Sequence, residues 1–136
     1  MSNQKTLSII KPDAVKAGHV HSINLMIENS GLKILEKKEL KLSKEQAKEF
    51  YVVHSDKPFY NDLCEFMTSG PIVVQILEGE NAIELYRRIM GSTNPDEADK
   101  NTIRKKFATS VQENAVHGSD NKDNAFKELN FFFKDV

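Results

Sequence analysis

The sequence predicts an α+β fold in which helices cover a four-stranded antiparallel sheet. Strand-like apolar runs alternate with segments whose apolar residues recur at helical spacing, in the order strand, helix, strand, helices, strand, helix, strand, helix. The 136 residues fit a single domain over residues 1–136, and a composition of 39% apolar and 29% charged residues indicates a folded, soluble protein.

Two strands and one helix are predicted in the first third of the chain. Residues 6–10 form a β-prone run that stops at Pro12, because proline has no amide hydrogen to continue a ladder. Apolar residues recur at helical spacing from Val20, and Gly31 supplies the left-handed residue that commonly ends a helix. Residues 32–42 then alternate as a strand with one face exposed to water, apart from Leu35, Glu36 and Lys38, which indicate an irregularity near its middle.

Two short helices and a central strand are predicted in the middle third. Residues 43–46 match a capping box, and Pro58 interrupts the helical pattern that follows, which indicates two helices meeting at a corner. The residues on these helical faces are Ala47, Phe50, Tyr51, His54, Leu63, Phe66 and Met67. Residues 72–77 are nearly all apolar, as in a strand covered on both faces.

The last third is predicted to contain a helix, an exposed loop, a short strand and a final helix. Residues 81–91 form the first helix, residues 92–101 are polar, and residues 102–107 add a helical turn or two. A strand over residues 115–116 precedes a helix that faces the core through Phe126, Leu129 and Phe133. The complete order matches a ferredoxin-like split β-α-β sandwich, although periodicity does not give the strand order.

Composition excludes several functional classes. The net charge of −1 provides no global positive field for nucleic acid, and no apolar run is long enough to span a membrane. The N-terminal residues lack the features of a secretory signal, so we expect a cytoplasmic protein. Cys64 has apolar neighbours and is predicted to be buried rather than reactive. His19 and His21 form an H-x-H pair without a third ligand, which favours surface histidines over a metal site.

Residues 114–120, Asn-Ala-Val-His-Gly-Ser-Asp, place an imidazole at a strand end just before a glycine turn. Neutral imidazole is a fair nucleophile near pH 7 when one nitrogen is free and the other is held. Glu128, on the final helix, is the candidate to hold His117 directly or through Ser119. The alternative interpretation is that His117 only ends an edge strand and that Glu128 is a solvated surface acid.

Three basic residues occupy positions that the predicted elements fix. Lys11 ends a strand, Arg87 lies within a helix and Arg104 follows the polar loop. If these cations converge they suit a phosphate chain, with Thr93 and Asn114 as neutral donors, because a guanidinium matches two phosphate oxygens. The alternative is three solvated surface charges. The sequence contains neither GxxxxGK[ST] nor GxGxxG, so a phosphate site here relies on side chains.

Two aromatic residues have competing interpretations. Phe59 follows Pro58 at the predicted helical corner, where its ring either stacks on a nucleobase of any kind or serves as a hydrophobic staple. Tyr51 lies on an apolar helical stripe, which favours a core position, and its hydroxyl then needs a buried partner.

Six segments, in order and over nearly the whole chain, resemble the nucleoside diphosphate kinase family. They are residues 8–13, 57–59, 69–71, 91–95, 102–104 and 114–120, and the last matches the family's active-site signature. The resemblance implies ping-pong transfer of the γ-phosphoryl group from a nucleoside triphosphate, usually ATP, to His117 and then to a nucleoside diphosphate. It also implies Mg²⁺ held largely by the nucleotide phosphates, and a homo-oligomer, with tetramer and hexamer both open.

The resemblance also implies roles for particular residues. Phosphate and sugar binding fall to Lys11, Arg87, Thr93, Arg104 and Asn114, with Lys11 also among the catalytic residues. Phe59 stacks on the base with Leu63 nearby. Tyr51 helps to hold the histidine environment, while Ser119 and Glu128 orient the imidazole. The resemblance gives no protein ligand for the metal.

The chain departs from the family pattern around Arg104. Asn101 stands where a glycine is frequent, and Lys105 and Lys106 replace a Gly-Asp or Ala-Asp pair. Residues 96–100 are unusually charged, and the chain ends at Val136 without the longer tail of many relatives. These departures concern loop rigidity and subunit packing. Two other functions stay open, a nucleotide-sensing or nucleic-acid-binding module without transfer and a histidine phosphatase-like hydrolase, for which we find no acid near the leaving group.

Overall fold

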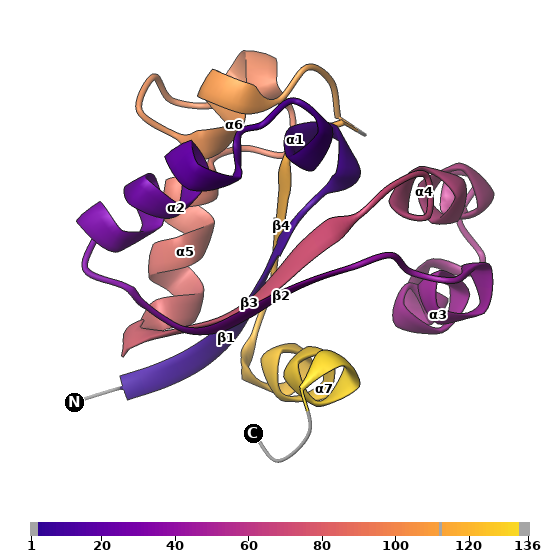
Figure 1. The fold of residues 1–136 in the computed structure, drawn as a ribbon, viewed down its shortest axis with the longest axis horizontal. Helices are drawn as coiled ribbons and strands as arrows, with labels where there is room; N and C mark the ends of the chain where they lie inside the picture. The colour runs from indigo at the N-terminus through magenta and orange to yellow at the C-terminus, as the bar shows by residue number, and fades with distance from the viewer. Residues whose placement is uncertain (1–2, 112, 134–136) are drawn as a thin grey trace.

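The structure, a computed structural model, describes residues 3–111 and 113–133. At its centre is a four-stranded antiparallel sheet with the strand order β2-β3-β1-β4 (Figure 1). The strands are β1 (Asn3–Ile10), β2 (Lys33–Leu40), β3 (Ile72–Glu80) and β4 (Val116–Gly118). The predicted α+β fold is confirmed, and the structure adds the strand order that periodicity could not provide.

Helices cover both faces of the sheet (Figure 1). The α-helices are α1 (Pro12–Lys16), α2 (Val20–Asn29), α3 (Lys44–Phe50), α4 (Tyr60–Met67), α5 (Ala82–Met90), α6 (Ile103–Phe107) and α7 (Lys122–Phe132), and the 3-10 helices are η1 (Val52–His54) and η2 (Pro95–Glu97). Among the described residues, no helix combines the length and the apolar character that crossing a bilayer requires.

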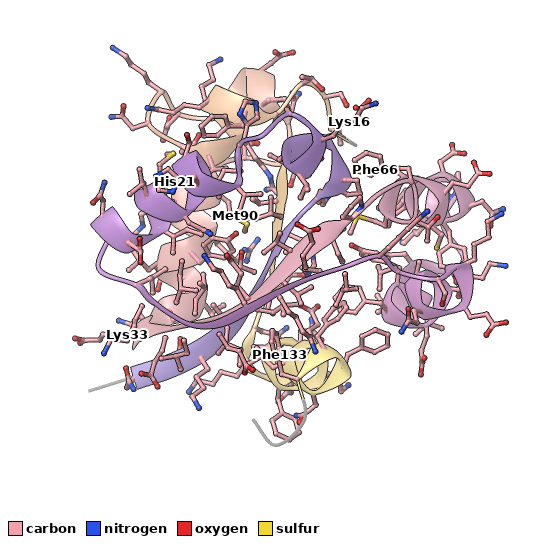
Figure 2. The ribbon with its side chains drawn as sticks, viewed as in Figure 1. Lys16, His21, Lys33, Phe66, Met90 and Phe133 are labelled. Atoms are coloured by element: carbon pink, nitrogen blue, oxygen red, sulfur yellow. The ribbon has the colours of Figure 1, made fainter. Side chains whose placement is uncertain are left out.

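Alternate residues of β1 belong to two separate cores. Leu7 and Ile9 pack with α3, α4 and α7, whereas Ile10 packs with α1, α2, α5 and α6 on the opposite face. Figure 2 shows side chains filling the space between the sheet and the helices, with Met90 of α5 among them. Because His117 lies opposite Ile9 in the β1–β4 ladder, His117 faces α7 and Gly118 faces α5.

Two features predicted from the sequence are confirmed locally. The pairing of β2 with β3 shifts register between Ile34 and Glu36, which is the irregularity expected near the middle of this strand. Leu35, which broke the alternation in the sequence, is 42% exposed at this point. Cys64 is buried in the core, as predicted.

Three helical expectations need correction. Helix α1 is not predicted by the sequence pattern, although Pro12 suits the first turn of a helix, where backbone N–H groups have no partner within the helix and proline loses no hydrogen bond. The stripe from Ala47 to His54 is interrupted, since α3 ends at Phe50 and η1 follows. Phe126, expected in the core, is 66% exposed, because α7 turns Ala125 and Leu129 toward the sheet instead.

Candidate active site

His117 lies at the middle of β4, where the ladder to β1 holds its backbone. Two aromatic rings pack against its imidazole in T-shaped arrangements, with centroid separations of 5.6 Å for Phe50 and 6.3 Å for Tyr51. Nε2 of His117 lies 3.0 Å from Oε1 of Glu128 on α7. Nδ1 makes no hydrogen bond to the described residues, so the ring has one nitrogen held and the other available.

One carboxylate oxygen of Glu128 bonds to two polar side chains. The Ser119 hydroxyl donates to Oε1 at 2.7 Å, beside the contact with His117. Burial opposes ionisation of this carboxyl, but the hydrogen bonds from His117 and Ser119 and the charge of His117 outweigh it and hold the pKa of Glu128 below its usual value. A carboxylate that accepts from Nε2–H fixes the tautomer in which Nδ1 carries the lone pair.

Lys11, Asn114 and Arg104 form a second group of polar side chains, which are 7%, 3% and 8% exposed. Lys11 Nζ donates to Asn114 Oδ1 at 2.8 Å. Arg104 donates to the backbone carbonyls of Asn114, Gly91 and Val116 at 3.3, 3.1 and 2.9 Å. Arg104 therefore ties the end of α5 to β4. Because a guanidinium has five N–H donors, two remain for a phosphate.

Burial disfavours the charged forms of Lys11 and Arg104 when no anion is bound beside them. Burial, with the positive charge of Arg104 beside it, lowers the pKa of Lys11 to about 8, although the Asp13 carboxylate partly opposes the shift. Burial likewise lowers the pKa of Arg104, and the charge of Arg87 contributes to this. A bound phosphate chain would favour the charged forms of Lys11, Arg87 and Arg104.

A strained turn places Asn114 next to Lys11. Ala115 has a φ of 73°, and the Val116 N–H donates to the Asn114 carbonyl at 2.9 Å, which makes a γ-turn with a positive φ. The Asp13 carboxylate accepts from the Ala115 N–H at 3.1 Å, and the Lys11 N–H donates to the Ala115 carbonyl at 2.8 Å. Asp13 was not predicted as a site residue. The turn that it supports lies about one hundred residues further along the chain, so the sequence around Asp13 carries no sign of this contact.

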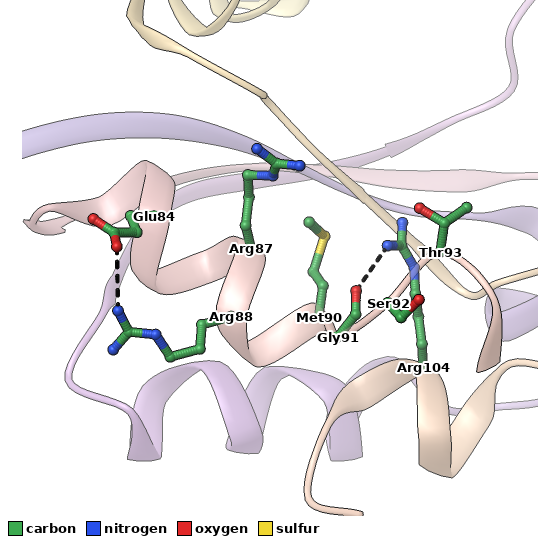
Figure 3. A pocket seen from close by; sticks show the side chains of 8 residues that line it. All are labelled: Glu84, Arg87, Arg88, Met90, Gly91, Ser92, Thr93 and Arg104. Carbon is green, nitrogen blue, oxygen red and sulfur yellow. Dashed lines mark hydrogen bonds and ion pairs between the residues drawn. The ribbon is translucent and has the colours of Figure 1, made fainter. Parts of the chain in front are cut away.

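An open pocket of about 490 Å³ lies between α5 and the loop that follows it. Figure 3 shows Arg87, Thr93 and Arg104 on its wall. The turn into the loop requires Gly91, because its φ is 86° and a Cβ there would lie 2.5 Å from Thr102 Oγ1. The glycine thus lets α5 and the start of α6 approach closely, which brings Arg104 to the pocket.

Aromatic rings form a path from His117 to the surface. The His54 ring lies 6.5 Å from that of Tyr51 and 5.5 Å from that of Phe59, which is 47% exposed. Within the described residues, the buried Tyr51 hydroxyl and His54 Nδ1 have no hydrogen-bond partner. Leu63 packs against the core at one side of α4. His54 is a second residue that sequence reasoning missed, since its helical spacing indicated only a place on the apolar stripe.

The arrangement combines an oriented nucleophile with buried cations. Among residues 3–111 and 113–133, no three His, Cys, Asp or Glu side chains gather where they would hold a metal ion, and the His19 ring instead packs on Phe107. Cations and amides line the site, which suits phosphate oxygens rather than a protein-bound metal. The predicted cations therefore lie close enough to influence one another, and Arg104 bonds to the carbonyl of Val116, the residue before His117.

Comparison with known proteins agrees with this chemistry. The model of the family "Nucleoside diphosphate kinase" matches residues 4–136. The chain belongs to the nucleoside diphosphate kinase family. It is 60% identical over 131 residues to a nucleoside diphosphate kinase of Nitrosococcus oceani, covering 96% of this chain and 92% of that protein. It is 57% identical over 133 residues to one from a Wolbachia strain of Drosophila simulans, covering 98% and 96%.

Solved structures of nucleoside diphosphate kinases have the same fold. The enzyme of Aquifex aeolicus matches with a TM-score of 0.96 and 41% identity, over 98% of this chain and 97% of that one. The enzyme of Halobacterium salinarum, solved in complex with CDP, matches with a TM-score of 0.93 and 36% identity, over 98% and 89%. The family and the kinase activity predicted from the sequence are confirmed, and the sensing or nucleic-acid-binding alternative is not favoured.

Proposed function

We propose that His117 carries the phosphoryl group between the two nucleotides and that Nδ1 is the attacking atom. The Nε2–Glu128 contact at 3.0 Å carries this proposal, because it leaves Nδ1 available. The Nδ1 lone pair attacks the γ-phosphorus of the triphosphate, the bond to the β–γ bridging oxygen breaks, and the nucleoside diphosphate leaves with that electron pair. Glu128 stabilises the positive charge that the imidazole gains. A terminal oxygen of a second nucleoside diphosphate then attacks the phosphorus of the phosphohistidine, the P–Nδ1 bond breaks with its electron pair returning to the imidazole, and a nucleoside triphosphate leaves.

Lys11, Arg104 and Asn114 bind the phosphate that is transferred in this proposal. Their burial and their links to β4 support the role, because donors that are already fixed need no reorganisation as the phosphorus reacts. Arg87 and Thr93 on the pocket wall bind the remaining phosphates and the sugar. His54, whose buried Nδ1 lacks a partner within the described residues, is a further phosphate donor.

The outer residues bind the nucleoside. Phe59, 47% exposed at the N-cap of α4, stacks on the base, and Leu63 in the first turns of that helix borders it. Tyr51 keeps its ring against the imidazole and orients its hydroxyl toward the phosphate. Support for a nucleotide in this fold comes from the Halobacterium salinarum relative, which was solved with CDP.

Mg²⁺ enters this site as part of the substrate, bridging phosphates of the nucleotide. The cationic lining described above supports this assignment over a metal held by carboxylates. The protein acts in the cytoplasm as a homo-oligomer, either tetramer or hexamer. The edge position of β2 and the exposed Leu35 on it support assembly. Light scattering on the purified chain measures the size of the assembly.

A labelling experiment tests the role of His117. The protein is incubated with γ-labelled ATP and Mg²⁺ and separated from free nucleotide; one portion is treated with acid, a second with alkali, and a third is chased with GDP while native. We expect a label that is labile in acid, stable in alkali and transferred to GTP, and that is absent from His117→Ala. Label on His117→Ala, or no label on the parent protein, would contradict the proposal. Release of the label only to water would indicate hydrolysis instead.

A further inference from the structure

A buried hydroxyl pair lies behind the nucleophile strand, on the face of the sheet away from the imidazole. Tyr86 of α5 and Ser8 of β1 are both fully buried, and their hydroxyl oxygens lie 2.7 Å apart. Ser8 is the register partner of Gly118, the residue after His117. The Gln75 side-chain amide donates weakly to Ser8 at 3.4 Å. The Tyr86 hydroxyl therefore bonds to the part of β1 that holds β4.

The Tyr86 ring also supports β4 directly. A Cβ added to Gly118 would lie 2.7 Å from Cδ2 of Tyr86 and 2.8 Å from the terminal methyl of Met90. Tyr86 thus fills the space that a side chain at position 118 would take. Among the described residues, β4 has three residues and pairs only with β1, so contacts with the α5 side of the sheet contribute strongly to its position.

The same helix carries a phosphate-binding cation. Arg87 follows Tyr86 in α5, and Gly91, whose carbonyl accepts from Arg104, ends the helix. A displacement of Tyr86 would therefore move β4, which carries His117, relative to α5. Burial raises the pKa of the Tyr86 phenol, so the hydroxyl stays protonated and retains its hydrogen bond.

We infer that Tyr86 is a positioning residue, which sets the distance between the His117 imidazole and the phosphate-binding end of α5 through its contacts with Ser8 and Gly118. The inference rests on the proposed role of His117. Tyr86 lies across the sheet from the imidazole, so it acts through the backbone of β4. A tyrosine that only fills the core would change stability when altered, without separating catalysis from binding.

The first test removes single hydroxyls from the α5 face of the sheet. We expect Tyr86→Phe to lower kcat at saturating nucleotide about threefold to tenfold, with the Kd for ADP within about twofold of the parent value. Ser8→Ala removes the same bond from its other partner and should act alike, which keeps the test valid if one variant folds poorly. Thr6→Val is the matched control, because the Thr6 hydroxyl is buried on the same strand without a partner in the described structure and kcat should not change.

The second test uses the steric contact. Gly118→Ala places a methyl group against the Tyr86 ring and should slow phosphorylation of His117 at least tenfold. Combining it with Tyr86→Leu should restore part of the lost rate, because the ring that the methyl meets is removed. The inference is wrong if Tyr86→Phe and Ser8→Ala keep the kcat of Thr6→Val, or if the folded double variant is no faster than Gly118→Ala. Failure of the proposed function is distinct, since the parent protein itself would then take no label.

Discussion

The candidate site has an inner half and an outer half that differ in burial and in connection. The inner half consists of Lys11, Arg104, Asn114, His117 and Glu128. Its members are buried or nearly so and are joined by hydrogen bonds to each other or to the backbone of β4. The outer half consists of three exposed residues, Phe59 just before α4, Arg87 on α5 and Thr93 in the loop after α5.

The difference between the halves corresponds to two tasks. Charge develops at the reacting phosphate, where donors with fixed positions contribute most to the rate. The base is distant from that charge. An aromatic side chain that stacks on the base without hydrogen-bonding to its edge accepts any base. We therefore expect inner substitutions to lower kcat and outer substitutions to raise KM.

Arg104→Lys should have the largest effect. The lysine side chain is shorter and ends in a single ammonium, so it cannot bond to three carbonyls and a phosphate at once as the guanidinium can. We expect kcat to fall on the order of 10²-fold to 10³-fold, with a lower Tm. Steady-state kinetics and thermal unfolding measure the two effects. Arg88→Lys is the control, since Arg88 is exposed and bonds within the described residues to Glu84 alone. Equal losses in both variants would contradict a specific role of the Arg104 guanidinium.

Glu128→Gln should lower kcat about tenfold to a hundredfold and leave KM nearly unchanged. The amide can still bond to His117 and Ser119, but it no longer stabilises the charge that the imidazole gains. Stopped-flow measurement of His117 phosphorylation gives the rate. Glu84→Gln, in an exposed ion pair on α5, is the matched control and should match the parent protein. A full rate in Glu128→Gln would show that the carboxylate charge is not needed.

The Lys11 ammonium should produce an alkaline limb in the pH profile. In the free enzyme its pKa is about 8, so raising the pH through this value removes the charge that meets the phosphate. We expect kcat/KM to fall about tenfold per pH unit above this point. Bound phosphates favour the charged amine, so the corresponding limb in kcat should lie at higher pH. A profile of kcat/KM that is flat to pH 10 would contradict the role of Lys11.

Phe59→Ala should have the smallest effect on chemistry. Loss of one stacking ring should raise KM about fivefold for purine and pyrimidine nucleotides alike, with kcat within about twofold. Initial rates with several diphosphates measure this. Val53→Ala is the neighbouring control, because Val53 is 72% exposed and we assign it no role. If the rise in KM depended strongly on the base, the outer half would instead recognise the base by hydrogen bonds to its edge.

Local patterns predicted most of the fold but only part of the site. Helical and strand periods located the elements, and the break at Leu35 indicated the bulge in β2, because these signals depend on neighbouring residues. Phe126 was placed wrongly because several faces of α7 carry apolar residues. Asp13, His54 and Tyr86 gained their interpretation only from contacts with residues distant in the sequence. Sequence spacing could not show that Arg104 uses most of its donors on backbone.

The most direct measurement compares the two halves in a single turnover. Glu128→Gln and Phe59→Ala are mixed with saturating ATP and Mg²⁺, and phosphorylation of His117 is followed in time. We expect Phe59→Ala to reach a rate within about twofold of that of the parent protein, and Glu128→Gln to remain at least tenfold slower. Equal slowing of both variants at saturation would contradict the division of the site into a reacting inner half and a binding outer half.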